Sequence, residues 1–176
     1  MRKLVFTAIF TALAVSGAAA QQAENMPTEI ATVRLGDVRV RYLNFKSNEE
    51  AFQALEKGSD VPGAKRGWVI ARLYPDKPIL WNGKPIYGGN ILILNPASGE
   101  TPMSFEVRVI DMRDVWVKPD VVAEPPEGTT VFSAPAQFET VPDVAERLTL
   151  ALSETEGGIQ LLIHYGSHLA KLQFTR

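Results

Sequence analysis

Alternation of apolar and polar residues with a period of two is the feature that most limits the folds open to this chain. In residues 30–45 apolar side chains alternate with arginines, and a Gly-Asp pair interrupts the pattern. The apolar positions are Val33, Leu35, Val38, Val40 and Tyr42, and the basic positions between them are Arg34, Arg39 and Arg41. Successive side chains of a strand point to opposite faces, so the pattern predicts two strands that each bury one face.

Further patterns of this kind follow, separated by turn-forming residues. The expected strands cover residues 68–74, 91–94, 105–110 and 115–117. Residues 118–130 contain three prolines and a glycine, so a long surface loop is expected there. A chain of short strands and turns with little helix predicts a mainly β fold, either an antiparallel β-sandwich or a flattened barrel.

Three glycines within residues 80–96 raise the question of a phosphate-binding loop. Gly83, Gly88 and Gly89 match neither of the common phosphate-loop spacings, and an aliphatic run rather than a helix follows them. The Asn-Gly pair in this segment is instead a strong signal for a β-hairpin with a type I′ turn. The turn would pair Trp81 with Lys84, Leu80 with Pro85 and Ile79 with Ile86. We therefore expect a hairpin at a sheet edge, where a proline is tolerated, followed by a strand buried on both faces.

One short helix is predicted after the first pair of strands. Ser47 and Glu50 have the spacing of a Ser-x-x-Glu capping box, and Glu49 places a second acidic residue at the positive end of the helix dipole. The apolar stripe consists of Ala51, Phe52 and Leu55. Gly58 follows Lys57 and supplies a stop signal, so about three turns of helix are expected.

The C-terminal segment IQLLIHYGSHLAKLQF predicts a second hairpin. Gly166 and Ser167 would form a two-residue type II′ turn in the middle of the segment. The turn would pair Tyr165 with His168, Ile163 with Ala170, Leu161 with Leu172 and Ile159 with Phe174. One face of this hairpin would then be almost wholly apolar, which is why this register is expected.

The N-terminus has the pattern of a secretory signal peptide. Arg2 and Lys3 precede an apolar stretch and a run of small residues that ends at Ala20, where cleavage is expected. Residues 21–29 are polar and are expected to form a disordered leader, so residues 30–176 would be a single β-rich domain. The apolar stretch is too short to span a bilayer, and the mature chain is expected to have no transmembrane span. The protein would be exported to the periplasm or the cell exterior.

Charge and composition exclude some classes of function. Residues 1–20 hold two of the 18 basic residues and no acidic ones, so the mature chain carries 16 basic against 20 acidic residues and a formal charge of −4. A nucleic-acid-binding role therefore has no electrostatic support. The chain has no cysteine, which excludes disulfides and thiolate metal sites and leaves packing to stabilise the exported fold.

The residue types that catalysis requires show no recognised arrangement. The serines lack a Gly-x-Ser-x-Gly context, and Asp111 and Asp114 flank a predicted turn, where acidic residues commonly form Asx turns. His164 and His168 are the only histidines, and on the predicted hairpin their rings would point to opposite faces. No catalytic residue, metal site or cofactor is therefore expected.

Aromatic residues beside cations are the candidate binding groups. Trp68, Trp81 and Trp116 lie near Arg66, Lys84 and Lys118 in the sequence, and Tyr87 is carried by the hairpin of residues 80–96. An exposed tryptophan beside a cation is common on surfaces that contact carbohydrate. The alternative is that these large aromatic side chains belong to the core, where such residues are most often found.

Two segments carry a resemblance to a known family. The segments WNGKPIYGGNILIL and LTLALSETEGGIQLLIHYGSHLAKLQF resemble motifs of a bacterial exported family, the domain-of-unknown-function family number 2911. The resemblance covers about a quarter of the chain and implies export but no established activity.

The hypothesis that fits these patterns best is a non-enzymatic envelope module. It would bind a small molecule, a glycan or a protein on a sheet face or at a sheet edge. One alternative is a carbohydrate-acting or hydrolase-like enzyme that uses scattered carboxylates. A second alternative is a structural subunit that assembles through a sheet edge.

Overall fold

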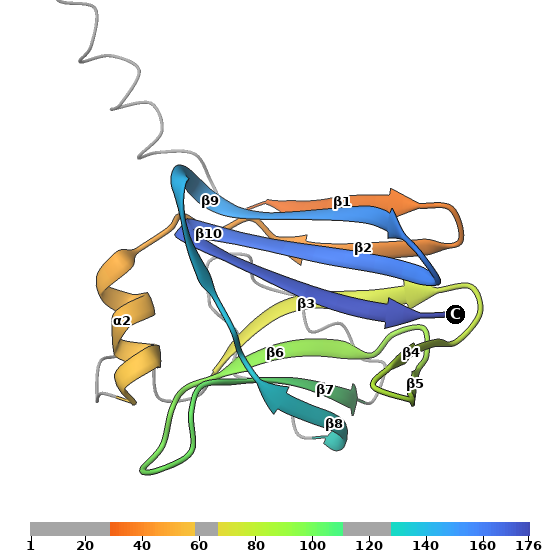
Figure 1. Ribbon diagram of the computed structural model, residues 1–176, viewed down its shortest axis with the longest axis horizontal. Coiled ribbons are helices and arrows are strands. Elements are labelled where there is room, and N and C mark those ends of the chain that lie inside the picture. Colours follow the sequence, from red (N-terminus) through yellow and green to blue (C-terminus); the bar gives the residue numbers. More distant parts are fainter. Residues whose placement is uncertain (1–28, 59–66, 111–127) are drawn as a thin grey trace, which may run out of the picture.

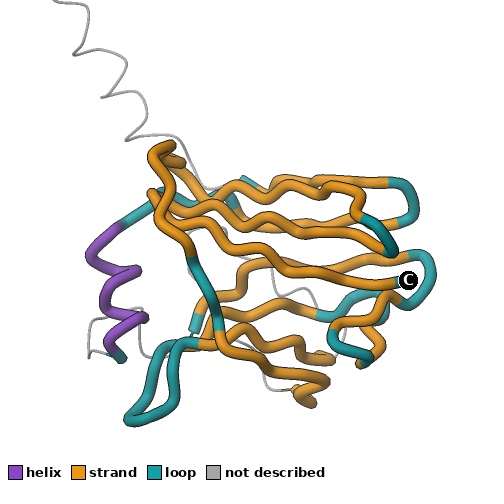
Figure 2. Tube along the Cα trace, in the orientation of Figure 1, coloured by secondary structure: helices purple, strands orange, loops and turns teal. Residues whose placement is uncertain are grey.

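The computed structural model describes residues 29–58, 67–110 and 128–176, which form two antiparallel sheets and one short helix (Figures 1 and 2). The prediction of a mainly β, sandwich-like fold is thus confirmed. The first sheet has six strands in the order β1 (Ile30–Leu35), β2 (Val38–Leu43), β3 (Trp68–Pro75), β6 (Ile91–Asn95), β7 (Ser104–Ile110) and β8 (Gly128–Pro135). The second sheet has four strands in the order β5 (Lys84–Ile86), β4 (Ile79–Trp81), β10 (Gly158–Thr175) and β9 (Glu139–Thr155).

Backbone hydrogen bonds join the two sheets near β2 and β9. The Ser47 N–H donates to the Glu146 carbonyl at 2.9 Å, and the Leu148 N–H donates to the Phe45 carbonyl at 2.9 Å. In Figure 1, β9 climbs from the level of β8 to the opposite side of the molecule and then runs along β10. The sheets are therefore layers of one sandwich, with β9 passing from one side to the other.

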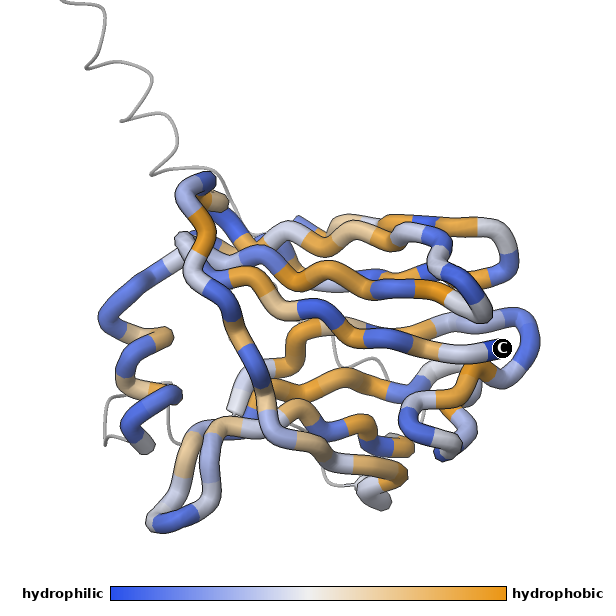
Figure 3. The backbone as a smooth tube through the Cα atoms, in the orientation of Figure 1, coloured by the Kyte–Doolittle hydropathy of each residue, from blue (hydrophilic) through white to orange (hydrophobic). Residues whose placement is uncertain are grey.

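The core lies between the sheets and follows the alternation seen in the sequence. Val38, Val40 and Tyr42 of β2 point into it together with Ile159, Leu161 and Ile163 of β10. Figure 3 shows hydrophobic and hydrophilic residues alternating along these strands. All four residues of 91–94 are at most 1% exposed, so the prediction of a strand buried on both faces is confirmed.

The Asn-Gly hairpin is also confirmed. Trp81 pairs with Lys84, Leu80 with Pro85 and Ile79 with Ile86. Asn82 and Gly83 have φ angles of 46° and 76°, as a type I′ turn requires. β5 is the edge strand of its sheet, so the missing N–H of Pro85 faces away from any partner strand.

The predicted helix is present as α2 (Glu49–Lys57), but its cap differs from the prediction. The side chain of Asn48, not Ser47, accepts a hydrogen bond from the Ala51 N–H at 3.0 Å. Ser47 instead donates its hydroxyl to the Ala145 carbonyl at 2.7 Å, which ties the chain before the helix to β9. Burial of Phe52 and of Leu55, each at most 1% exposed, contributes about 1.5–3 kcal/mol per side chain.

The predicted C-terminal hairpin is wrong. β10 runs through Gly166 without a turn and pairs with β9, and Glu156-Gly157 forms the connection instead. The apolar residues change from odd to even positions between Tyr165 and Ala170, which the sequence interpretation attributed to a turn. A bulge produces the same change, because the β9–β10 register shifts on both sides of Gly166, whose φ of 59° suits glycine.

Several predictions lie outside the described residues. These are the signal peptide of residues 1–20, all of the leader except Glu29, the strand over 115–117 and both aspartates of the 111–114 turn. Of the predicted loop over 118–130, the last three residues belong to β8, so the loop prediction is wrong for them. The described part of the chain contains no helix with the length and hydropathy of a membrane span.

Candidate functional site

The six-stranded sheet carries a group of arginines on the face that is directed away from the core. Residues paired directly across antiparallel strands share a face, which places these side chains together. Arg34 pairs with Arg39, Arg41 pairs with Arg72, and Ile91 lies between Arg72 and Arg108. We call this surface the arginine face, defined by Arg34, Arg39, Arg41, Arg72 and Arg108.

Two features of the arginine face destabilise the folded protein when no ligand is bound. Arg34 lies directly opposite Arg39, and Arg41 lies directly opposite Arg72, so like charges face each other across two strand pairs. Such pairs destabilise a sheet, by contrast with the apolar pairs on its inner face. Among the described strand residues whose side chains lie on this face, Glu106 is the one that carries a carboxylate.

Arg72 is the most unusual residue of the arginine face. It lies within the otherwise apolar β3 and is only 3% exposed. Its Nη1 is 3.5 Å from the Tyr74 hydroxyl, whereas its Nε and Nη2 are buried and have no hydrogen-bond partner among the described residues. Burying a charged group without hydrogen-bond partners costs several kcal/mol. A hydrogen-bond acceptor at Nε and Nη2 would offset this cost.

Glu106 forms a fully partnered cluster two strands away. Its carboxylate accepts hydrogen bonds from Arg108 Nε at 2.9 Å and Arg108 Nη2 at 3.0 Å. Thr130 Oγ1 lies 2.5 Å from the same carboxylate, and Asn95 Nδ2 donates to it at 2.8 Å. Burial raises the pKa of Glu106, but the hydrogen bonds from Arg108, Thr130 and Asn95 outweigh burial, so the pKa is lowered. Glu106 is therefore an ionised structural group.

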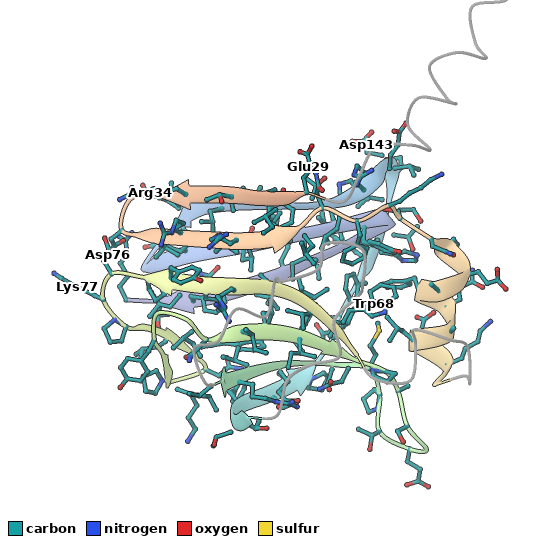
Figure 4. The ribbon with its side chains drawn as sticks, turned by 180° about the vertical axis from the view of Figure 1, so that it is seen from behind. Glu29, Arg34, Trp68, Asp76, Lys77 and Asp143 are labelled. Atoms are coloured by element: carbon teal, nitrogen blue, oxygen red, sulfur yellow. The ribbon has the colours of Figure 1, made fainter. Side chains whose placement is uncertain are left out.

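The rim of the arginine face is open to solvent. Arg34 and Arg39 are exposed, and Arg41 is half-buried beside Arg72. The Arg39 guanidinium lies 4.8 Å from the centre of the Tyr74 ring, and Arg34 Nε donates to the Gly36 carbonyl at 3.1 Å. Figure 4 shows Arg34 at the turn between β1 and β2. The arginines around the buried Arg72 are therefore partly or fully exposed to solvent.

Two of the four predicted binding residues are core residues instead. Trp68 is 4% exposed and packs against Phe45 and Tyr165, and Trp81 is 5% exposed and packs against Phe132 and Phe174. Neither indole can present its ring to a ligand at the surface, so this part of the binding hypothesis is corrected. Figure 4 shows Trp68 at the α2 end of β3, between the sheets.

Of the other two predicted binding residues, Tyr87 belongs to the described part of the chain. Tyr87 is 53% exposed on the segment after β5, where its backbone N–H donates to Asn90 Oδ1 at 2.9 Å. Trp116 lies outside the described residues. The exposure of Tyr87 leaves its ring available to a partner.

The two histidines have separate surroundings. His164 Nε2 is 3.1 Å from the Asp143 carbonyl, whereas His168 Nε2 is 2.9 Å from Glu49 Oε2 and its ring stacks on Phe52 at 3.9 Å. His168 thus ties β10 to helix α2. The described residues contain no group of three or more His, Cys, Asp or Glu side chains placed to hold a metal ion.

Tyr165 and Ser47 complete the junction between α2 and β10. The Asn48 N–H donates to the Tyr165 hydroxyl at 2.7 Å, and the Gly166 N–H donates to Ser47 Oγ at 3.1 Å. Burial raises the pKa of Tyr165 to about 12, with a hydrogen bond to Asn48 opposing the rise and the charge of Glu49 adding to it. Tyr165 therefore stays protonated at physiological pH and serves as a structural hydrogen-bonding group.

No family model, curated protein or solved structure matches this chain. The candidate site therefore rests on the geometry described above.

The sequence contained a signal for the arginine face. Arginines alternating with apolar residues in 34–41 indicated a charged outer face, and one arginine interrupts the apolar segment WVIARLYP. An isolated cation in a strand that is buried on both faces is unusual, because arginine is rarely buried without a partner.

Proposed function

We propose that this protein is an exported, non-enzymatic binding module that holds an anionic ligand on the arginine face. The observation that carries the proposal is the set of five arginines on one sheet face, with a single described carboxylate that is already fully hydrogen-bonded. Binding an anion would relieve the repulsion between these arginines. Export remains a prediction from the signal-peptide pattern, as does the resemblance to the exported family.

Several features favour binding over catalysis at this face. The arginine guanidiniums supply fixed positive charge and hydrogen-bond donors, but they cannot act as proton acceptors. The lowered pKa of Glu106 keeps this carboxylate ionised and unsuited to act as a general acid. The described residues of the face thus provide the groups that recognise an anion and lack an obvious proton-transfer pair.

A thermal-shift screen tests the proposed function. The purified protein would be heated in chloride buffer of constant ionic strength with acetate, succinate, phosphate or sulfate, and with a neutral sugar for comparison. A ligand that binds only the native state raises the melting temperature in proportion to the logarithm of its concentration. We expect at least one oxyanion to raise the melting temperature and the neutral sugar to leave it unchanged.

Two substitutions test whether the anion binds at the arginine face. Arg41→Met removes the cation that lies directly opposite Arg72, and Lys84→Met removes an exposed cation from the other sheet. We expect Arg41→Met to weaken the response to the anion and Lys84→Met to retain it. Equal responses from both variants, or no response of the unaltered protein to any oxyanion, would refute the proposed function.

A further inference from the structure

The two unpartnered nitrogens of Arg72 define a specific point on the arginine face. Nε and Nη2 lie on one edge of the planar guanidinium and form a fork that matches two oxygens of a single oxyanion. Both atoms are buried, and neither has a hydrogen-bond partner in residues 29–58, 67–110 or 128–176. The remaining nitrogen, Nη1, is the one that approaches Tyr74.

The same sheet face shows how such a fork is used. Arg108 directs the equivalent atoms, Nε and Nη2, at the two carboxylate oxygens of Glu106, at 2.9 and 3.0 Å. Arg72 and Arg108 lie on either side of Ile91 in one row across three strands. The same sheet face thus carries a carboxylate-bound fork and, two strands away, a fork whose nitrogens have no acceptor among the described residues.

We propose that Arg72 is the anchor of the anion site and binds a small oxyanion, a carboxylate or phosphoryl group, through Nε and Nη2. This inference rests on the proposed function and names the group that the arginine face recognises. Arg41, directly across the strand pair, supplies a second positive charge beside the anchor. Because Arg72 is only 3% exposed, the bound group must be small or must be the terminus of a larger molecule.

Geometry distinguishes this role of Arg72 from a general attraction between charges. Lysine would keep the positive charge but would lose the planar fork. Losing charge-assisted hydrogen bonds of this kind weakens binding by about 10- to 100-fold. The comparison of Arg72→Lys with Arg72→Met therefore separates charge from bidentate recognition.

The experiment titrates the protein and its variants with sodium acetate and, separately, with sodium phosphate at constant ionic strength. For the unaltered protein we expect a rise in melting temperature of about 5 °C or more at 100 times the dissociation constant of the preferred anion. Arg72→Met should abolish the response, and Arg72→Lys should shift the dissociation constant at least 10-fold. Lys84→Met is the matched control and should behave as the unaltered protein does. The anion that gives the lower dissociation constant, acetate or phosphate, identifies the carboxylate or the phosphoryl group as the preferred ligand.

Three outcomes would overturn the inference in distinguishable ways. If no oxyanion stabilises the unaltered protein, the proposed function fails and this inference fails with it. If Arg72→Met responds fully while Arg41→Met does not, the arginine face binds anions without Arg72 as its anchor.

The third outcome concerns an acceptor from within the chain. Residues 111–127 contain five acidic side chains, at 111, 114, 120, 124 and 127, and each can be changed to its amide. If one amide variant destabilises the protein only when Arg72 is present, the fork binds an internal carboxylate and the inference is wrong. Additive effects of each amide change with Arg72→Met support an external ligand.

Discussion

Arg72 and Arg108 lie in one row of the same sheet face, but their guanidinium groups differ in the hydrogen bonds that they make. Arg108 donates through Nε and Nη2 to Glu106, which also receives hydrogen bonds from Thr130 and Asn95. Arg72 is more deeply buried than Arg108, yet the same two atoms have no hydrogen-bond partner in the part of the chain that the structure describes. Folding alone accounts for the first arrangement and does not account for the second.

The difference teaches how to separate a structural charge from a functional one. A buried ion pair with all of its hydrogen bonds formed is compatible with a stable fold and needs no ligand. A buried cation with unpartnered donors destabilises the free protein, and binding an anion would recover that free energy. Removing Glu106 from the first arrangement and replacing Arg72 in the second should therefore change the free energy of unfolding in opposite directions.

The largest effect is expected from breaking the partnered cluster. Glu106→Ala removes the acceptor of four hydrogen bonds and leaves the Arg108 guanidinium largely buried without it. We expect the free energy of unfolding to fall by about 3–5 kcal/mol, measured by urea denaturation. Glu100→Ala, at an exposed turn, is the control and should change stability by less than about 0.5 kcal/mol. A similar small change for Glu106→Ala would show that the cluster contributes little.

The opposite sign is expected at Arg72. Arg72→Met replaces a buried, incompletely partnered cation with an apolar side chain of similar length. In chloride buffer without oxyanions we expect the free energy of unfolding to rise by about 1–4 kcal/mol. Urea denaturation with and without the stabilising oxyanion checks this, because the gain should shrink when the anion is present. Destabilisation of several kcal/mol in chloride buffer would contradict the comparison of the two arginines.

The elements of this fold that could be predicted from sequence are those whose signal is local. The Asn-Gly turn fixed the register of β4 and β5, and the aliphatic run at 91–94 showed a strand buried on both faces. Helix α2 was recognisable from its charges and its C-terminal glycine. In each case a few neighbouring residues determine the backbone conformation.

The errors came from choices that depend on distant partners. Apolar residues change face near Gly166 whether the chain turns or bulges, and the long β9 strand is what makes the bulge favourable. Ser47 is a good helix cap by type, but the carbonyl of Ala145 and the N–H of Gly166 engage its hydroxyl. The arginine face likewise exists only after five strands pair in one register, so sequence spacing could not assemble it.

A smaller effect is expected at the hydrogen-bonded junction between α2 and β10. Tyr165→Phe keeps the buried ring and removes the hydroxyl that accepts from the Asn48 N–H. We expect a loss of about 1–2 kcal/mol in the free energy of unfolding, measured by urea denaturation. Tyr87→Phe is the matched control, because that ring is exposed, and it should change stability by less than about 0.5 kcal/mol. Equal effects of the two changes would show that the buried hydroxyl adds nothing.

The smallest effect concerns Glu49, whose carboxylate is about half exposed at the same junction. Its pKa is lowered below the usual 4.5, chiefly by the hydrogen bond from Gln53, with desolvation opposing and His168 adding to the fall. A folded-state pKa below the unfolded value means that Glu49 stabilises the protein above about pH 4.5, and that this contribution is lost as the pH falls through the folded pKa. Glu49→Gln should therefore be less stable than the unaltered protein at pH 6, with the difference shrinking toward pH 3 in urea denaturation. Glu50→Gln, at the neighbouring exposed position, is the matched control for the loss of one negative charge from the first turn of α2. A difference for Glu49→Gln that stays constant from pH 6 to pH 3 would show that ionisation of this carboxylate plays no part in holding helix α2 on β10.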